Sequence, residues 1–219
     1  MATHGTHAYE DPAAGPDGFP HLVRDALALA RAQGFPYSCR PEQGRLLRVL
    51  AGGAATRVAE TGTGLGVGLA WLASGARAGV RLYSVERDPE RARLAAGVFA
   101  ERPEVTVLHG DWRRIEEHGP FDLLVLDGGG QGKAPGDPPA DVERLLVPGG
   151  TVVVDDFTPA TGRPPRHGGG VDLARVHWLE HPALRAVELR LAADLSAVVG
   201  TRPLPEEATG EGKGRPLRG

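Results

Sequence analysis

The sequence is poor in cysteine and lysine and carries no excess of positive charge. Cys39 is the single cysteine among 219 residues, which excludes an internal disulfide and a cysteine-rich structural zinc site. Lys133 and Lys213 are the only lysines, and 25 Lys and Arg stand against 28 Asp and Glu, for a net charge of -3. This charge balance argues against nucleic acid as a partner.

Long apolar runs are absent as well. No stretch approaches the ~18 apolar residues that a membrane span requires. The first residues, MATHGTHAYEDPAAGPDG, have neither a basic start nor an apolar segment, unlike a secretory signal peptide. We therefore expect a cytoplasmic protein without a membrane partner, and the chain length predicts one domain of ordinary size.

Both ends of the chain are rich in Gly and Pro, whereas the middle alternates between strand and helix patterns. We expect residues 1–18 and 204–219 to be flexible and residues 19–203 to form a single domain. Two amphipathic helices are predicted first, over 21–34 and 41–53. Five short apolar segments then read as buried strands: TRVAE, RLYSVE, VTVLHG, FDLLVLD and TVVVDD. Helical stretches separate them, which predicts an α/β sheet covered on both faces.

The last two predicted strands differ in how they are connected. ALRAVELRL and DLSAVVGTR are joined only by AAD, which is too short for a crossover and requires an antiparallel hairpin. The predicted fold is therefore α/β and doubly wound, with a mostly parallel seven-stranded sheet and an antiparallel last strand.

A glycine-rich loop, ETGTGLGVG, follows the first predicted strand and opens a helix. It should lie at the carboxyl edge of the sheet, where such folds bind ligands. The dinucleotide pattern G-x-G-x-x-G fails, because Val67 or Leu69 stands where the third glycine belongs. A dinucleotide-dependent reductase is therefore disfavoured.

Acids at the ends of the first three strands suggest another ligand. Glu60, just before the glycines, would repel a pyrophosphate but attract a cationic amine. Glu86 closes the second strand, where an acid can hold both ribose hydroxyls. Asp111 ends the third strand and can accept from an adenine amine or cap the next helix, and Trp112 beside it offers a stacking surface. S-adenosylmethionine brings an amine, a ribose and an adenine without a phosphate.

Over residues 36–202 the chain resembles the class I S-adenosylmethionine-dependent methyltransferases. The segments VAETGTGLG, LYSVERDP, HGDW, FDLLVLD and LLVPGGTVVVDD occur in the order and spacing of that family. The resemblance implies a Rossmann-like methyltransferase fold. The residues expected to bind the cofactor are Glu60, Thr61, Gly62, Gly64, Gly66, Glu86, Arg87, Asp111, Trp112 and Asp127.

Three aspartates follow neighbouring strands, Asp127 after the fourth and Asp155 with Asp156 after the fifth. Neighbouring strand ends lie about 5 Å apart, so these carboxylates would repel one another without a cation among them. Hard divalent cations prefer such oxygen ligands. The pattern resembles the metal-dependent O-methyltransferases of catechols and caffeoyl-CoA, in which the matching residues bind Mg²⁺ or Ca²⁺.

The resemblance implies O-methylation of a small hydroxylated molecule, in which the metal lowers the pKa of the acceptor hydroxyl. Little chain is left over to bind a macromolecular acceptor. One alternative stays open: a relative of this fold that binds S-adenosylmethionine but needs no metal or catalyses a non-methylating reaction. A homodimer is also compatible with the resemblance, although the sequence identifies no interface.

The candidate catalytic residues are Asp127, Lys133 and His167. The subgroup often carries a basic lysine three residues after the strand-four aspartate, but Gly130 occupies that position and Lys133 comes three residues later. His167, in the loop RPPRHGGG, is the rival base because histidine titrates in a useful range. Metal activation without a protein base is the third alternative.

Overall fold

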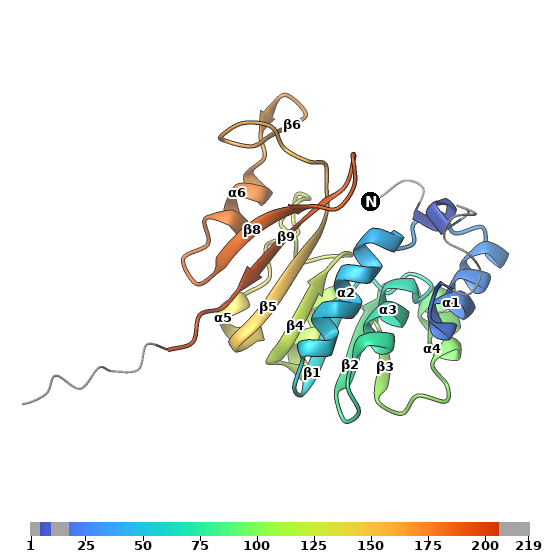
Figure 1. Cartoon of the computed structure of the whole chain (residues 1–219). Coiled ribbons are helices and arrows are strands. Elements are labelled where there is room, and N and C mark those ends of the chain that lie inside the picture. The colour runs from blue at the N-terminus through green and yellow to red at the C-terminus, as the bar shows by residue number, and fades with distance from the viewer. Residues whose placement is uncertain (1–4, 10–17, 206–219) are drawn as a thin grey trace, which may run out of the picture.

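The computed structural model describes residues 5–9 and 18–205, which build a seven-stranded sheet in the order β3-β2-β1-β4-β5-β9-β8 (Figure 1). Strand β9 is antiparallel to both of its neighbours, and all other neighbouring strands are parallel. The sheet confirms the predicted fold. The strands are β1 Arg57–Thr61, β2 Arg81–Glu86, β3 Val105–His109, β4 Phe121–Leu126, β5 Leu146–Phe157, β8 Arg185–Arg190 and β9 Ser196–Thr201.

Helices cover both faces of the sheet. The α-helices are α1 His21–Ala32, α2 Pro41–Gly53, α3 Val67–Gly75, α4 Pro89–Val98, α5 Val142–Leu145 and α6 Leu173–Leu179. Helices α1 to α3 pack on one face, and α5, α6 and the 3₁₀-helix η3 (Trp112–His118) pack on the other. The predicted helical crossovers before β4 and β5 are thus short, one a 3₁₀-helix and the other a single α-turn.

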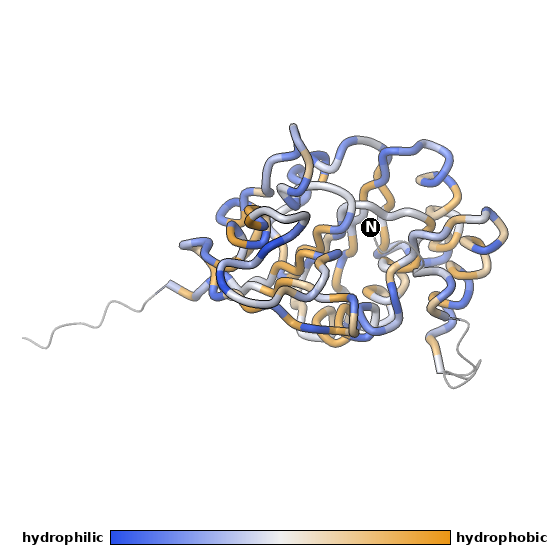
Figure 2. The backbone as a smooth tube through the Cα atoms, turned by 90° about the horizontal axis from the view of Figure 1, so that it is seen from above, coloured by the Kyte–Doolittle hydropathy of each residue, from blue (hydrophilic) through white to orange (hydrophobic). Residues whose placement is uncertain are grey.

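The core follows from the alternation of side chains along strands that are buried on both faces. Val58 and Val125 point into the cluster under α1 to α3, whereas Ala59 and Leu124 point into the cluster under α5 and α6. Figure 2 shows the apolar segments of the tube gathered in the interior and the hydrophilic ones at the periphery. Burial on both faces explains why these strands read as continuous apolar runs.

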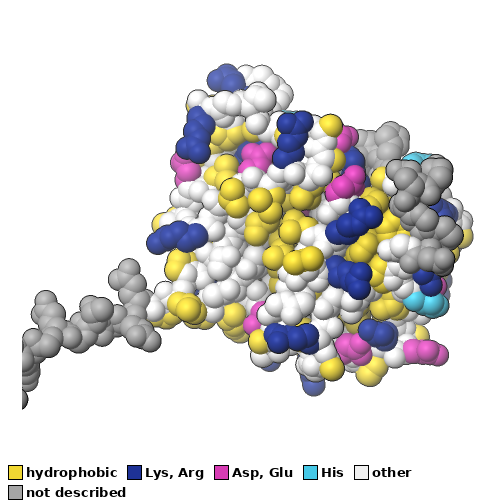
Figure 3. Space-filling view, viewed as in Figure 1, with side chains coloured by type: hydrophobic (Ala, Val, Ile, Leu, Met, Phe, Trp, Pro, Cys, Tyr) yellow, Lys and Arg dark blue, Asp and Glu magenta, His cyan; other side chains and the backbone are white. Residues whose placement is uncertain are grey.

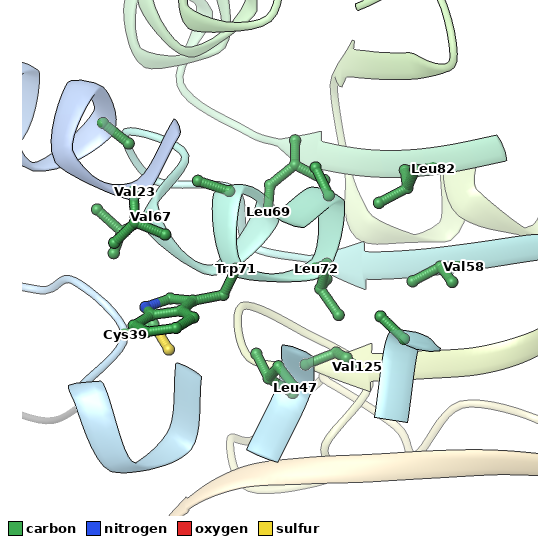
Figure 4. Packing of buried hydrophobic residues seen from close by; sticks show 14 of the residues in the cluster. Val23, Cys39, Leu47, Val58, Val67, Leu69, Trp71, Leu72, Leu82 and Val125 are labelled. Carbon is green, nitrogen blue, oxygen red and sulfur yellow. The ribbon is translucent and has the colours of Figure 1, made fainter. Parts of the chain in front are cut away.

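Helix α3 lies between helices α1 and α2 on one face of the sheet, and every residue from Val67 to Ala73 is buried. Such a helix has no polar face because it meets protein all round. Its Trp71 lies beside Cys39, close to Leu47 of α2 (Figure 4). The indole Nε1 donates a hydrogen bond to Tyr9 Oη at 2.9 Å, and Tyr9 Oη donates to the carbonyl of Cys39 at 2.7 Å.

Tyr9 belongs to a short 3₁₀-helix, η1 (Gly5–Tyr9), within the segment that we expected to be flexible. Its ring is 7% exposed and packs edge-on against Phe19. Thr6 of η1 donates to the carbonyl of Phe35 at 2.6 Å. Residues 5–9 therefore pack onto the domain, while residues 1–4, 10–17 and 206–219 of the two expected flexible segments lie outside the described residues.

A two-stranded arm, β6 (Arg166–His167) and β7 (Gly170–Val171), stands away from the main sheet within the long loop after β5 (Figure 1). Within the described residues, no helix is both long and apolar enough to cross a bilayer. On the face seen in Figure 3, the Lys and Arg side chains are dispersed and do not form one basic patch.

The turns that follow β1 and β4 approach each other through two glycines. Gly62 has φ +86°, and a Cβ built on it would lie 2.5 Å from the Cα of Gly128. Real Cβ atoms do not approach backbone so closely. These two glycines therefore allow the ends of the neighbouring strands to meet without a side chain between them.

The substitution Gly62→Ala should destabilise the fold more than Gly79→Ala does. Gly79 has nearly the same φ, +88°, but a Cβ there meets nothing within 4 Å. Gly79→Ala should cost only the left-handed strain of about 1 kcal/mol, whereas Gly62→Ala adds overpacking of about 1–3 kcal/mol. Urea unfolding of both variants measures the difference, and equal losses would contradict the close approach.

Candidate functional site

A cavity of about 460 Å³ opens at the carboxyl edge of the sheet, above β1, β2, β4 and β5. It lies where the glycine loop and the strand-end acids were expected to meet. The segment before α2 forms one wall. Its lining includes Phe35, Cys39, Gln43, Glu60, Gly62, Thr63, Gly64, Glu86, Arg87, Arg91, Trp112, Asp127, Asp155 and Asp156.

The glycine loop is built from left-handed residues. Gly62, Gly64 and Gly66 have φ of +86°, +55° and +91°, conformations that side-chain-bearing residues adopt at a cost. The N–H of Gly64 donates to Glu86 Oε2 at 2.8 Å, which ties the loop to the end of β2. Thr61, predicted to touch the cofactor, is fully buried and donates to the carbonyl of Gly129 at 2.8 Å.

Glu60 is a buried carboxylate at the end of β1, with 2% of its surface exposed. Ser84 of β2 donates to its Oε2 at 2.8 Å and contacts the hydroxyl of Thr63 at 2.6 Å. Gly68 lies close beside it, because a Cβ there would overlap Glu60 Oε1 and the carboxylate would have to shift. Burial raises the pKa of Glu60 to about 8, against the lowering effect of the Ser84 hydrogen bond. A cationic ligand bound beside Glu60 would therefore stabilise its ionised form, which burial disfavours.

Glu86 is held from several sides at the end of β2. Its Oε1 accepts from the N–H of Asp88 at 2.9 Å and from Arg91 Nη2 at 2.8 Å. The guanidinium of Arg91 also lies 5.8 Å from the ring centroid of Phe35. These contacts fix a carboxylate that lines the cavity.

Ser84 and Arg91 donate hydrogen bonds to these acids, and the sequence analysis predicted neither of them. Ser84 is the one small polar residue in the stretch LYSV, a signal that was present in the sequence. Arg91 lies in the first turn of α4, and only the fold brings it back onto Glu86. Gln43, also unpredicted, lines the cavity and is 2% exposed.

The third predicted acid lies apart from the cavity. Asp111 caps η3 by accepting from the N–H of Arg113 at 3.1 Å, and its side chain is half exposed. Trp112 does line the cavity and is 6% exposed, and Arg87 lines it as well. The capping role of Asp111 is thus observed, and its contact with an adenine stays a prediction.

Asp127, Asp155 and Asp156 come together as expected, each offering a carboxylate oxygen within 4.8 Å of the other two. Asp155 is 2% exposed, and its Oδ1 accepts no hydrogen bond from the described residues. Burial, followed by the neighbouring carboxylates, raises the pKa of Asp127 and raises that of Asp155 to about 7. A compact set of oxygen donors with an unpartnered buried oxygen fits a hard divalent cation.

The two candidate bases lie outside the cavity lining. The Nζ of Lys133 donates to the backbone carbonyls of Asp155 and Asp156, the latter at 2.9 Å. His167 is exposed on β6, in the arm that stands away from the sheet. The geometry therefore brings the three aspartates together, places Lys133 against the backbone of two of them and leaves His167 on the arm.

Comparison with known proteins agrees with this geometry. Residues 59–157 match a family model described as a methyltransferase domain. A candidate O-methyltransferase of Mycobacteroides abscessus is 41% identical over 148 residues, which are 59% of this chain and 65% of that protein. A second candidate O-methyltransferase, from a Mycobacterium strain, is 37% identical over 52% of this chain and 54% of its own length. The chain thus spans between half and two thirds of these curated relatives.

Solved structures share the fold over almost the whole chain. Cofactor-bound Rv0187 from Mycobacterium tuberculosis has a TM-score of 0.70 at 25% identity, covering 93% of this chain and 99% of that one. An O-methyltransferase from Bacillus cereus in complex with S-adenosylhomocysteine has a TM-score of 0.68 at 21% identity, covering 90% and 98%. These findings confirm the resemblance to class I S-adenosylmethionine-dependent methyltransferases.

Replacing Glu60 by glutamine should make the protein more stable at alkaline pH. Since the pKa of Glu60 is about 8 in the folded protein and 4.5 in its ordinary state, its contribution to stability is complete below pH 4.5 and is lost as pH rises toward 8. Glu60→Gln removes that loss, so its advantage over wild type should be near zero at pH 4.5 and about 1–3 kcal/mol at pH 8.5.

Calorimetric melting in a chelating buffer measures this advantage, at about 2–4 °C per kcal/mol for a chain of this size. Glu90→Gln, on the exposed surface of α4, is the matched control and should behave like wild type at both pH values. An advantage of Glu60→Gln that is the same at pH 4.5 and 8.5 would rule out titration of Glu60 as its cause.

Proposed function

We propose that this chain methylates a hydroxyl oxygen of a small molecule with the help of a divalent cation. Its fold and its matching domain are those of class I S-adenosylmethionine-dependent methyltransferases. One observation carries the proposal. A single cavity joins the two acids suited to S-adenosylmethionine, Glu60 and Glu86, to the aspartate cluster suited to a metal. The relatives named above as O-methyltransferases support oxygen as the accepting atom.

At the cofactor end of the cavity, each acid binds one part of the methyl donor. Glu60 pairs with its ammonium group, whose positive charge offsets the cost of burying this carboxylate. Glu86, already oriented by Arg91 and the Gly64 N–H, accepts from the ribose hydroxyls. Trp112 forms the apolar wall beside the adenine.

At the acceptor end, Asp127, Asp155 and Asp156 would hold Mg²⁺ or Ca²⁺. A cation bound there would act as a Lewis acid and would lower the pKa of an acceptor hydroxyl. The aspartates fix the acceptor side of the cavity relative to Glu60, which holds the donor. This fixed spacing is the main contribution of the protein, since the methyl donor is already activated.

The reaction transfers a methyl group from sulfur to oxygen. The acceptor oxygen forms a bond to the methyl carbon with its lone pair, the carbon–sulfur bond breaks, and its electron pair remains on sulfur. The products are a methyl ether, S-adenosylhomocysteine and one proton. Because neither Lys133 nor His167 lines the cavity, metal activation without a protein base is the favoured route for that proton.

The cavity also sets the size of the acceptor. Its volume of about 460 Å³ is shared between the methyl donor and the acceptor, which favours a small molecule. Two vicinal oxygens would suit a cation that keeps some positions free of protein ligands. A catechol such as 3,4-dihydroxybenzoate is therefore the acceptor class to test.

Removing the carboxylate of Glu86 should weaken cofactor binding. We expect Glu86→Ala to lower the affinity for S-adenosylhomocysteine about 10–100-fold, since each lost hydrogen bond to a charged group is worth about 1.5–3 kcal/mol. Titration calorimetry measures the affinity. Glu90→Ala, on the outer surface of α4, should bind as wild type does. If wild type takes up no S-adenosylhomocysteine at all, the proposed function is wrong.

Replacing Asp155 by asparagine should remove the metal response while leaving the cofactor in place. Calorimetry of wild type with Mg²⁺ or Ca²⁺ should give binding heat that Asp155→Asn lacks, and turnover of 3,4-dihydroxybenzoate should stop in chelator. Its 4-hydroxy analogue, with one hydroxyl, should be a poor acceptor. Cofactor binding without a metal effect would instead favour the metal-independent or non-methylating alternative.

A further inference from the structure

The loop between β4 and α5, residues 127–141, reaches across to the end of β5 with two side chains. Gln131 Nε2 donates to the carbonyl of Leu126 at 2.9 Å and to the carbonyl of Asp155 at 3.1 Å. Lys133 Nζ donates to the carbonyls of Asp155 and Asp156. Two consecutive carbonyls beside the metal-binding carboxylates are therefore held by this loop.

These carbonyls need partners because β5 is irregular at this point. Its antiparallel pairing with β9 shifts register between Val154 and Phe157, so that Asp155 and Asp156 form a bulge. Bulges re-aim side chains and leave backbone groups without ladder partners. The donors from Gln131 and Lys133 satisfy backbone oxygens that would otherwise lie partly buried and unpaired.

The bulge is also strained. Asp156 has φ +61°, the one positive φ of a non-glycine residue in the described parts of the chain. Such a conformation is unfavourable for a residue with a side chain and persists where the surroundings enforce it. The ammonium group of Lys133, which donates to the carbonyls of Asp155 and Asp156, is a direct means of enforcing this conformation.

The position of Lys133 fits this role and no other that the mechanism offers. Its Nζ lies 3.8 Å from the centroid of the Phe157 ring and lies outside the cavity lining. The charged groups that act on it are Asp127, Asp155, Asp156 and Asp172, all negative. Its donors are directed at two backbone carbonyls, those of Asp155 and Asp156.

We propose that Lys133 is a positioning residue that holds the Asp155–Asp156 turn and so sets the spacing of the metal-binding carboxylates, and that it is not the proton acceptor of methyl transfer. The inference rests on the proposed function, because it concerns how the aspartate cluster binds its cation. It replaces the base role that the sequence suggested for Lys133 with a structural one on the same site.

Two substitutions separate the roles. Lys133→Arg keeps a cation that donates hydrogen bonds but never accepts a proton at working pH, whereas Lys133→Met keeps the length and removes the charge. Lys133→Arg should retain Mg²⁺ affinity and kcat within about threefold. Lys133→Met should lose Mg²⁺ affinity about 10–100-fold, as outer groups of metal sites do, and should recover kcat at saturating Mg²⁺.

A base would behave in the opposite way. Both variants would then lose kcat about 10²–10⁴-fold with an unchanged calorimetric Kd for Mg²⁺, which would overturn the inference. S-adenosylhomocysteine affinity equal to wild type reports that each variant is folded. If Lys133→Met does not fold, Gln131→Met, which removes the neighbouring donor to the Asp155 carbonyl, should weaken Mg²⁺ binding in the same direction.

Failure of the proposed function is recognisable in the same experiment. Wild type that gives no heat with Mg²⁺ overturns the metal-assisted function and the inference together. Heat in wild type that disappears in Asp155→Asn but remains unchanged in Lys133→Met and Gln131→Met overturns the inference alone. Calorimetry thus decides on the role of Lys133 without relying on turnover.

Discussion

The constraint on which this structure depends is the gathering of negative charge at one edge of the sheet. Glu60, Glu86 and the three aspartates converge on one cavity because each lies at the carboxyl end of a strand in the parallel part of the sheet. Burial and mutual repulsion raise the pKa of Glu60, Asp127 and Asp155. Cationic ligands bound among these acids would offset this cost.

Glu86 and Glu60 have different hydrogen-bond partners, and the difference matches the ligand group that each would bind. Glu86 has Arg91 as an ion-pair partner, which suits an acid that accepts from neutral ribose hydroxyls. Glu60 has instead the hydroxyl of Ser84, which leaves room for a cation to supply the missing charge. An arginine beside Glu60 would stabilise the empty protein and would repel the ammonium group of the methyl donor.

The sequence alone predicted the sheet, its antiparallel last strand and the meeting of the aspartates, because strand ends in a parallel sheet share one edge. It could not predict which way side chains turn in irregular segments. Asp111 caps η3 and faces solvent, and residues 5–9 pack through Tyr9 although their composition is that of a loop. Ser84 and Arg91 act on acids from neighbouring elements, so their roles depend on tertiary contacts.

The departure at Gly130 from the subgroup pattern has a steric cause. Gly130 has φ +74°, and a Cβ there would lie 3.1 Å from the Trp112 ring and 3.2 Å from the Cβ of Ala140. A lysine at this position would be both strained and crowded, because Trp112 packs against the loop. The positive charge enters three residues later instead, where Lys133 can reach the carbonyls of Asp155 and Asp156. Packing of the Trp112 ring thus disfavours a side chain at position 130, and the positive charge of Lys133 lies instead against the backbone of Asp155 and Asp156.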